Sequence, residues 1–118
     1  MKKLEIQGIE RKIIGGKDGC PPMTLYTIPA TGGSKKNVMM YGHLDKQPWM
    51  NGWKEGLGPT KPVLQDNNLL YGRGGADDGY SVFSSMLAIK NAHLQGVPTP
   101  RCVMVLESEE ESGSPHLV

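Results

Sequence analysis

Three short segments of this chain carry side chains that can bind a metal ion or move a proton. The first, YGHLDKQP, contains His43 and Asp45; the second, YGRGGADDGY, contains Asp77 and Asp78; the third, ESEEESGS, contains the acidic run 109–111. One imidazole and several carboxylates form a ligand set that suits zinc or another divalent metal ion. If the three segments meet in space, they can form a metal site.

The glycine-rich turn of the second segment has two chemical interpretations. A turn of this kind that leads into a helix is commonly a phosphate-binding site. Here, however, the turn contains Asp77 and Asp78, whose negative charges would repel an anion. The sequence therefore favours a cation, because glycines let the backbone turn tightly enough for a carboxylate to face a metal.

Each segment also has a purely structural interpretation. A histidine after an apolar strand can be a hydrogen-bonded structural residue, an aspartate before a helix can be a cap worth about 1 kcal/mol, and three glutamates can form a solvated loop. The spacing of His43 and Asp45 adds evidence for a site, because residues two apart on a strand point to the same side. A carboxylate there can accept the second N–H of a metal-bound imidazole. Two successive glutamates can divide metal binding and proton transfer between them.

The elements that must position these segments follow from the hydrophobic pattern. Strands are expected at 23–28, 37–45, 69–73 and 102–107, with one strand or a bent pair within 4–14. Apolar residues recur at helical spacing at Val82, Phe83, Met86, Leu87 and Ile89, which predicts a helix over 81–94 with Asp78 at its N-cap and Gly96 at its end. This order predicts an α/β fold, a mixed or largely parallel sheet with packed helices. Ligands bind beyond the carboxyl ends of strands in such sheets, so the three segments are expected at one edge.

The composition limits the class of protein. The chain has 118 residues, which suits one domain, and a formal net charge of +1, which excludes nucleic acid or an anionic membrane as the main partner. Cys20 and Cys102 match no disulfide framework or metal-binding spacing, which favours a reduced cytoplasmic setting. The N-terminal residues contain no long apolar run, so neither a signal peptide nor a membrane helix is expected.

Taken together, the motifs resemble those of metallopeptidase family M20. The strings YGHLDKQP, GW, LLYGRGGADDG and EEESGS occur in the family's order from about Asn37 to the end of the chain. The likeness is to the branch of cytosolic non-specific dipeptidases and carnosinases. This resemblance implies zinc-dependent hydrolysis of dipeptide bonds by a metal-activated water, with a small peptide as substrate.

The resemblance also implies a role for each site residue. His43 would bind one zinc ion, Asp77 would bridge two, and Glu111 would bind the second; Mn2+ or Co2+ could replace zinc. Asp45 would orient His43, and Glu110 would be the general base. Glu109 remains as an additional acidic neighbour, and a shift of the alignment by one residue would exchange the roles of the glutamates.

Two departures from the family pattern affect these expectations. The family commonly has Asp-Asp-Lys-Gly, where this chain has Asp77-Asp78-Gly79-Tyr80. The resemblance further implies a strained backbone after Asp77, with a cis peptide to Asp78. The family's later metal ligands and its lid or dimerisation domain have no counterpart, so residues 1–118 are expected to be part of a catalytic domain, with motifs in 37–118, from a homodimeric parent.

Other functions share the same residues. An amino-acid deacylase or desuccinylase of the same family would contain every motif quoted above, because these residues activate water and do not select the substrate. A non-catalytic domain that has kept the fold is the second alternative, and the Gly79-Tyr80 variation is its support. His93 and His116 are expected to be surface residues without a role.

Overall fold

A four-stranded mixed sheet forms the centre of the protein. The computed structural model describes residues 5–66 and 68–117. The strand order is β1-β2-β6-β3, in which β3 and β6 run parallel and the other neighbouring pairs run antiparallel. The strands are β1 (Glu10–Ile14), β2 (Met23–Ile28), β3 (Asn37–His43) and β6 (Arg101–Glu107). The predicted α/β fold with a mixed sheet is confirmed.

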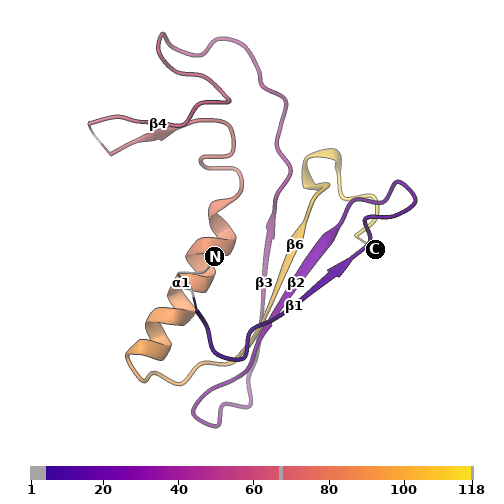
Figure 1. Cartoon of the computed structure of the whole chain (residues 1–118), viewed down its shortest axis with the longest axis vertical. Coiled ribbons are helices and arrows are strands. Elements are labelled where there is room, and N and C mark those ends of the chain that lie inside the picture. The colour runs from indigo at the N-terminus through magenta and orange to yellow at the C-terminus, as the bar shows by residue number, and fades with distance from the viewer. Residues whose placement is uncertain (1–4, 67, 118) are drawn as a thin grey trace.

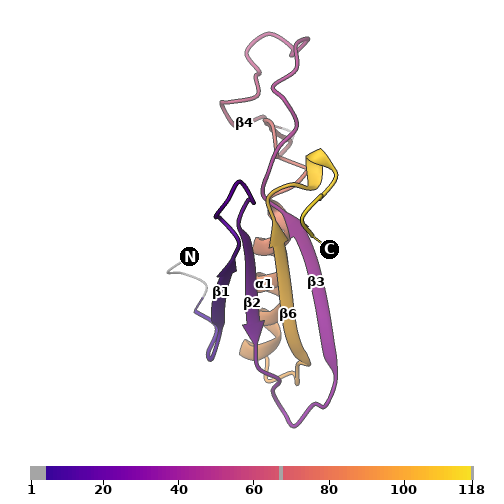
Figure 2. The same ribbon diagram turned by 90° about the vertical axis from the view of Figure 1, so that its right-hand side faces the viewer.

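One helix, α1 (Tyr80–Leu94), lies along one face of this sheet (Figure 2). Val82, Met86 and Ile89 recur at three- and four-residue spacing, and all three are buried in the core with apolar residues of β2 and β6. Phe83 and Leu87 belong to the same helical spacing, but these side chains are 52% and 50% exposed. Helical spacing alone therefore does not show which apolar side chains are buried, because α1 also carries apolar residues on a side that does not meet the sheet.

Both helix ends are close to their predicted positions. The N-cap is Gly79, so Asp78, which was predicted to be the N-cap, lies one residue before it. The carboxylate of Asp78 nevertheless accepts the backbone N–H of Ser81, 3.2 Å away, so it still satisfies a free donor of the first turn. At the other end, Gly96 adopts a φ of +67°, which glycine tolerates without the steric cost that a Cβ would bring.

The connection between β3 and β6 brings the functional segments together. The chain leaves β3, forms a long excursion beyond the end of the sheet, returns through α1 and then enters β6 parallel to β3 (Figure 1). The start of α1 therefore lies at the edge where β3 and β6 end. The excursion contains β4 (Val63–Leu64) and β5 (Leu70–Tyr71), which pair with each other in a separate two-stranded sheet.

The strand predicted at 69–73 is thus shorter than expected and lies outside the main sheet. Leu69 and Leu70 are 51% and 58% exposed, so this apolar run is not a core strand. Asp77 consequently reaches the site as part of the turn before α1. It does not follow a strand of the main sheet, as the sequence analysis assumed.

The sheet face opposite α1 is open. Among residues 5–66 and 68–117, no second α-helix covers it, and Met39 and Tyr41 of β3 are 73% and 47% exposed. The radius of gyration is 16.9 Å, whereas a compact domain of this length would have about 13.5 Å. No helix in the described part of the chain is long and apolar enough to cross a membrane.

Candidate metal centre

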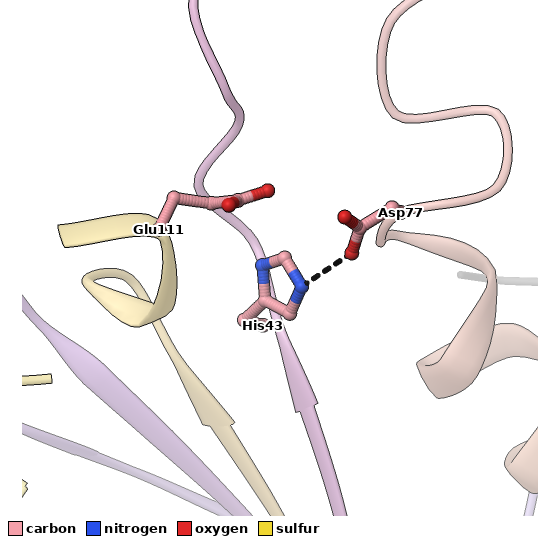
Figure 3. A group of neighbouring side chains, drawn as sticks. All are labelled: His43, Asp77 and Glu111. Carbon is pink, nitrogen blue, oxygen red and sulfur yellow. Dashed lines mark hydrogen bonds and ion pairs between the residues drawn. The ribbon is translucent and has the colours of Figure 1, made fainter. Parts of the chain in front are cut away.

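His43, Asp77 and Glu111 meet beyond the end of the sheet (Figure 3). His43 is the last residue of β3, Asp77 belongs to the turn before α1, and Glu111 belongs to the 3-10 helix η1 (Glu110–Ser112) after β6. One potential ligand atom from each side chain lies within 4.8 Å of the other two. The prediction that these three residues converge is confirmed.

His43 is buried and surrounded by carboxylates. Its side chain is 7% exposed, its Nε2 lies 3.0 Å from Asp77 Oδ1, and the same nitrogen lies 3.8 Å from Glu110 Oε2. Burial alone would lower the pKa of His43, but the hydrogen bond to Asp77 and the charges of Glu110 and Asp45 outweigh it, so the pKa is raised. The negative potential that favours a proton here also favours a metal cation.

Asp45 connects the first segment to the third. Its Oδ1 lies 3.4 Å from His43 Nδ1, and that ring nitrogen is also 3.3 Å from the Asp45 carbonyl oxygen. The carboxylate accepts the backbone N–H groups of Glu110 and Glu111, at 3.2 and 2.9 Å. Asp45 therefore lies next to the imidazole that it is predicted to orient, and it also holds η1 in position, which the sequence did not indicate.

Asp78 is engaged by backbone and hydroxyl donors and has a structural role. It accepts hydrogen bonds from the backbone N–H of His43 at 3.2 Å and from the Ser81 hydroxyl at 2.5 Å. Burial would raise the pKa of Asp78, but the hydrogen bonds from Ser81, Gly79 and His43 lower it to about 2. The Asp77 side chain, by contrast, is 70% exposed. Of the two aspartates, only Asp77 is available to a metal.

The predicted cis peptide between Asp77 and Asp78 is wrong. No cis peptide occurs in the described residues. The unusual backbone conformation lies at Gly79, whose φ of +151° is one that L side chains rarely adopt. Glycine tolerates this conformation because it has no Cβ.

The three glutamates of the third segment have different surroundings. Glu109 forms an ion pair with His116, at 2.8 Å, and Glu110 is 43% exposed on its side chain. Glu111 Oε1 is buried and has no hydrogen-bond partner. A buried carboxylate oxygen without a partner is costly, and a cation next to His43 and Asp77 would remove that cost. The donor set of imidazole and carboxylates therefore fits a divalent metal ion.

Three contacts at this site had no signal in the sequence. Gln47 donates its side-chain amide to Glu111 Oε2 at 2.5 Å, and Lys46 donates to the carbonyl oxygen of Asp78. The Tyr41 hydroxyl donates to Glu107. Partial desolvation of that hydroxyl, although Tyr41 as a whole is half-exposed, and the buried Glu107 carboxylate raise the pKa of Tyr41 to about 12. All three are polar residues inside or next to quoted motifs, but only their geometry shows what they touch.

The two remaining histidines are only partly as expected. His116 is 51% exposed on its side chain but pairs with Glu109. His93 is half-buried, and its Nε2 lies 2.9 Å from the hydroxyl of buried Thr99 at the far end of the sheet. His93 is thus a hydrogen-bonded packing residue and was wrongly expected at the surface.

The fold matches solved dipeptidases over nearly its whole length. Human carnosine dipeptidase 1 superposes with a TM-score of 0.70 and 25% sequence identity, over 98% of this chain and 25% of that chain. The di-peptidase Dug1p of Saccharomyces cerevisiae gives a TM-score of 0.69 and 25% identity, over 97% of this chain and 26% of that one. The chain thus spans about a quarter of each solved enzyme.

The sequence leads to the same group of proteins. It is 36% identical over 88 residues to the Cys-Gly metallodipeptidase DUG1 of Candida albicans, a match that covers 69% of this chain and 17% of that protein. Residues 39–118 match Peptidase family M20/M25/M40. This match contains His43, Asp45, Asp77, Glu110 and Glu111, the residues that the structure brings together. The chain therefore belongs to Peptidase family M20/M25/M40.

Proposed function

We propose that this chain provides part of the metal site of a dipeptidase, which hydrolyses the peptide bond with a metal-activated water. The observation that carries the proposal is the cluster of His43, Asp77 and Glu111, with ligand atoms within 4.8 Å of one another and a buried Glu111 oxygen that has no partner. Family membership and the named dipeptidases among the relatives support the reaction class.

In this proposal His43, Asp77 and Glu111 would hold two zinc ions. Zinc bound there would lower the pKa of a coordinated water and polarise the carbonyl of the scissile bond. Imidazole and carboxylate ligands are compatible with zinc, and also with Mn2+ or Co2+. The free thiols Cys20 and Cys102 support a reducing, cytoplasmic compartment.

Glu110 is the proposed general base. Its Oε2 lies 3.8 Å from His43 Nε2, so it reaches the space that the ligands enclose, yet its side chain is 43% exposed and can approach a substrate. It takes a proton from the attacking water and transfers that proton to the leaving amine. Asp45, which accepts the backbone N–H of Glu110, positions the base.

The substrate test uses the full-length product of the reading frame that contains these 118 residues. The purified protein is assayed against dipeptides with C-terminal glycine or histidine and against N-acetyl and N-succinyl amino acids. We expect the dipeptides to be hydrolysed with a higher kcat/KM, and activity to disappear with a chelator and return with zinc. Preference for the acylated amino acids would assign a deacylase or desuccinylase. No hydrolysis by the zinc-loaded protein would favour a non-catalytic domain.

A further inference from the structure

Gln47 contacts one oxygen of Glu111 and leaves the other free. The side-chain nitrogen of Gln47 lies 2.5 Å from Glu111 Oε2. Because an ionised carboxylate can only accept hydrogen bonds, the NH2 group of the amide must face Glu111, with its carbonyl oxygen turned away. The second oxygen, Oε1, is buried and has no hydrogen-bond partner. The two oxygens of one carboxylate therefore stand in different chemical surroundings.

The same short segment also fixes the backbone of Glu111. Asp45 Oδ2 accepts the Glu111 N–H at 2.9 Å, while Gln47, two residues later, holds the end of the side chain. With both ends held, rotation of the carboxylate is restricted. Loss of a hydrogen bond that orients a metal ligand in this way typically lowers metal affinity by about 10- to 100-fold.

We propose that Gln47 is a positioning residue that makes Glu111 a monodentate metal ligand. Its amide takes one of the acceptor sites of Oε2, whereas Oε1 has no hydrogen-bond partner and keeps all of its acceptor sites for a metal ion next to His43 and Asp77. This inference rests on the proposed function to the extent that Glu111 binds a metal. It adds a specific claim, namely which atom binds and which residue selects it.

The first measurement is a titration of the full-length product of the reading frame that contains these residues with Co2+ alone, followed by visible absorption. Gln47→Leu and Gln47→Met remove the amide donor and keep a side chain of similar size. We expect each variant to bind Co2+ about tenfold more weakly than the wild type. The matched control is Gln95→Leu, an exposed glutamine at the far end of α1, which should leave the affinity unchanged.

A structural role alone would not change the binding mode of the carboxylate, and infrared spectroscopy can detect that mode. In the difference spectrum between the Co2+-loaded and metal-free protein, with 13C-labelled glutamate, the wild type should show the wide splitting of carboxylate stretching bands that a monodentate ligand gives. The Gln47 variants should show a narrower splitting, because Oε2 is then free to bind as well. An unchanged spectrum together with unchanged affinity would overturn the proposal.

Glu111→Gln separates this inference from the function on which it rests. If Glu111→Gln binds Co2+ as tightly as the wild type, Glu111 is no ligand, and both the proposed metal site and the role of Gln47 are wrong. If Glu111→Gln weakens binding and the Gln47 variants do not, only the role of Gln47 is wrong. Should Gln47 act through Glu111, the double variant Gln47→Leu/Glu111→Gln will bind no more weakly than Glu111→Gln alone.

Discussion

The carboxylate of Asp78 accepts the backbone N–H of His43, 3.2 Å away, where the end of β3 meets the start of α1. The Ser81 hydroxyl and backbone N–H bind the same carboxylate at 2.5 and 3.2 Å. Asp78 thereby joins the strand that carries His43, one proposed metal ligand, to the helix that follows Asp77, another. The adjacent aspartates divide two tasks, because one fixes the backbone and the other faces the ligand cluster.

Replacing Asp78 should therefore destabilise the protein. Asp78→Ala removes a charged acceptor and leaves the buried His43 N–H without its partner, which should lower the free energy of unfolding by about 2–4 kcal/mol. Urea denaturation followed by circular dichroism measures this. The control is Asp66→Ala, an exposed aspartate in the long excursion, which should change stability by less than about 0.5 kcal/mol. Equal effects of the two substitutions would contradict the structural role of Asp78.

The same carboxylate should make the free energy of unfolding depend on pH in the acid range. Its pKa falls from 3.8 to about 2 in the folded protein, so the unfolded chain takes up the proton first as the pH is lowered. The stability that ionised Asp78 contributes is present above about pH 4 and is lost as the pH falls towards 2. The difference in unfolding free energy between the wild type and Asp78→Asn should shrink over that interval. A constant difference would show that Asp78 does not titrate in this range.

Gly42 has no room for a side chain. A Cβ at this position would lie 2.9 Å from Asp78 Oδ2 and 3.0 Å from Ser81 Cβ, and still closer to the Ser81 hydroxyl oxygen. Gly42→Ala should therefore separate β3 from α1 and cost about 1–3 kcal/mol of stability. Gly58→Ala is the control, because nothing lies within 4 Å of a Cβ there. Thermal unfolding of both variants tests the prediction, and an unaffected Gly42→Ala would refute the close approach.

Substitution of the two glutamates of η1 should have different effects on turnover and metal content. In the full-length product, Glu110→Ala should abolish turnover and leave metal content unchanged, since the general base is not a ligand. Glu111→Ala should lose metal, because its buried Oε1 has no other partner. Metal analysis and dipeptide hydrolysis on the same preparations distinguish the two. The reverse pattern would mean that the roles are shifted by one residue.

We expect zinc to bind weakly to the 118-residue chain itself. The proposed roles give each zinc ion only two protein ligands, His43 with Asp77 and Asp77 with Glu111, whereas catalytic zinc sites usually have three. Without a cation, the carboxylates of Asp77, Glu110 and Glu111 repel one another. Calorimetric titration checks this. Tight binding of two zinc ions, together with dipeptide hydrolysis, would show that further ligands complete the site within these residues.

Much of the fold could be read from periodic patterns in the sequence. The spacing of Val82, Met86 and Ile89 predicted α1, because a helix that packs on a sheet buries residues three and four apart. The continuous apolar run of β6 predicted a strand that is buried in the sheet. The strand predicted at Leu69 and Leu70 was wrong about burial, since two adjacent leucines form the same apolar pattern in a covered strand and in an exposed one. Which strands pair with β6 could not be predicted, because β2 and β3 are distant from β6 in the sequence and a local pattern does not show long-range pairing.

The site was predictable at the level of ligand types and less so at the level of contacts. Histidine, aspartate and glutamate commonly bind metals, and His43, Asp77 and Glu111 stand at or near the ends of predicted elements. Their residue types and positions were therefore enough to select them as candidates. A glutamine such as Gln47 has no comparable signal, because its amide can face solvent or any acceptor. Asp78 was correctly associated with the helix start, but its bond to the His43 backbone depends on the crossover between β3 and α1.

The parallel pairing of β3 with β6 also bears on the order of folding. His43 and Asp77 are 34 residues apart, and Asp45 and Glu111 are 66 apart. Each contact that joins two of the three segments therefore closes a long loop. Such contacts are entropically expensive until the intervening segments have ordered. The hairpin of β1 and β2 needs only a short loop and can form first. We therefore expect metal-binding capacity to appear late in refolding, after α1 has docked and β6 has joined β3, so that the kinetics of metal uptake report the last step of folding.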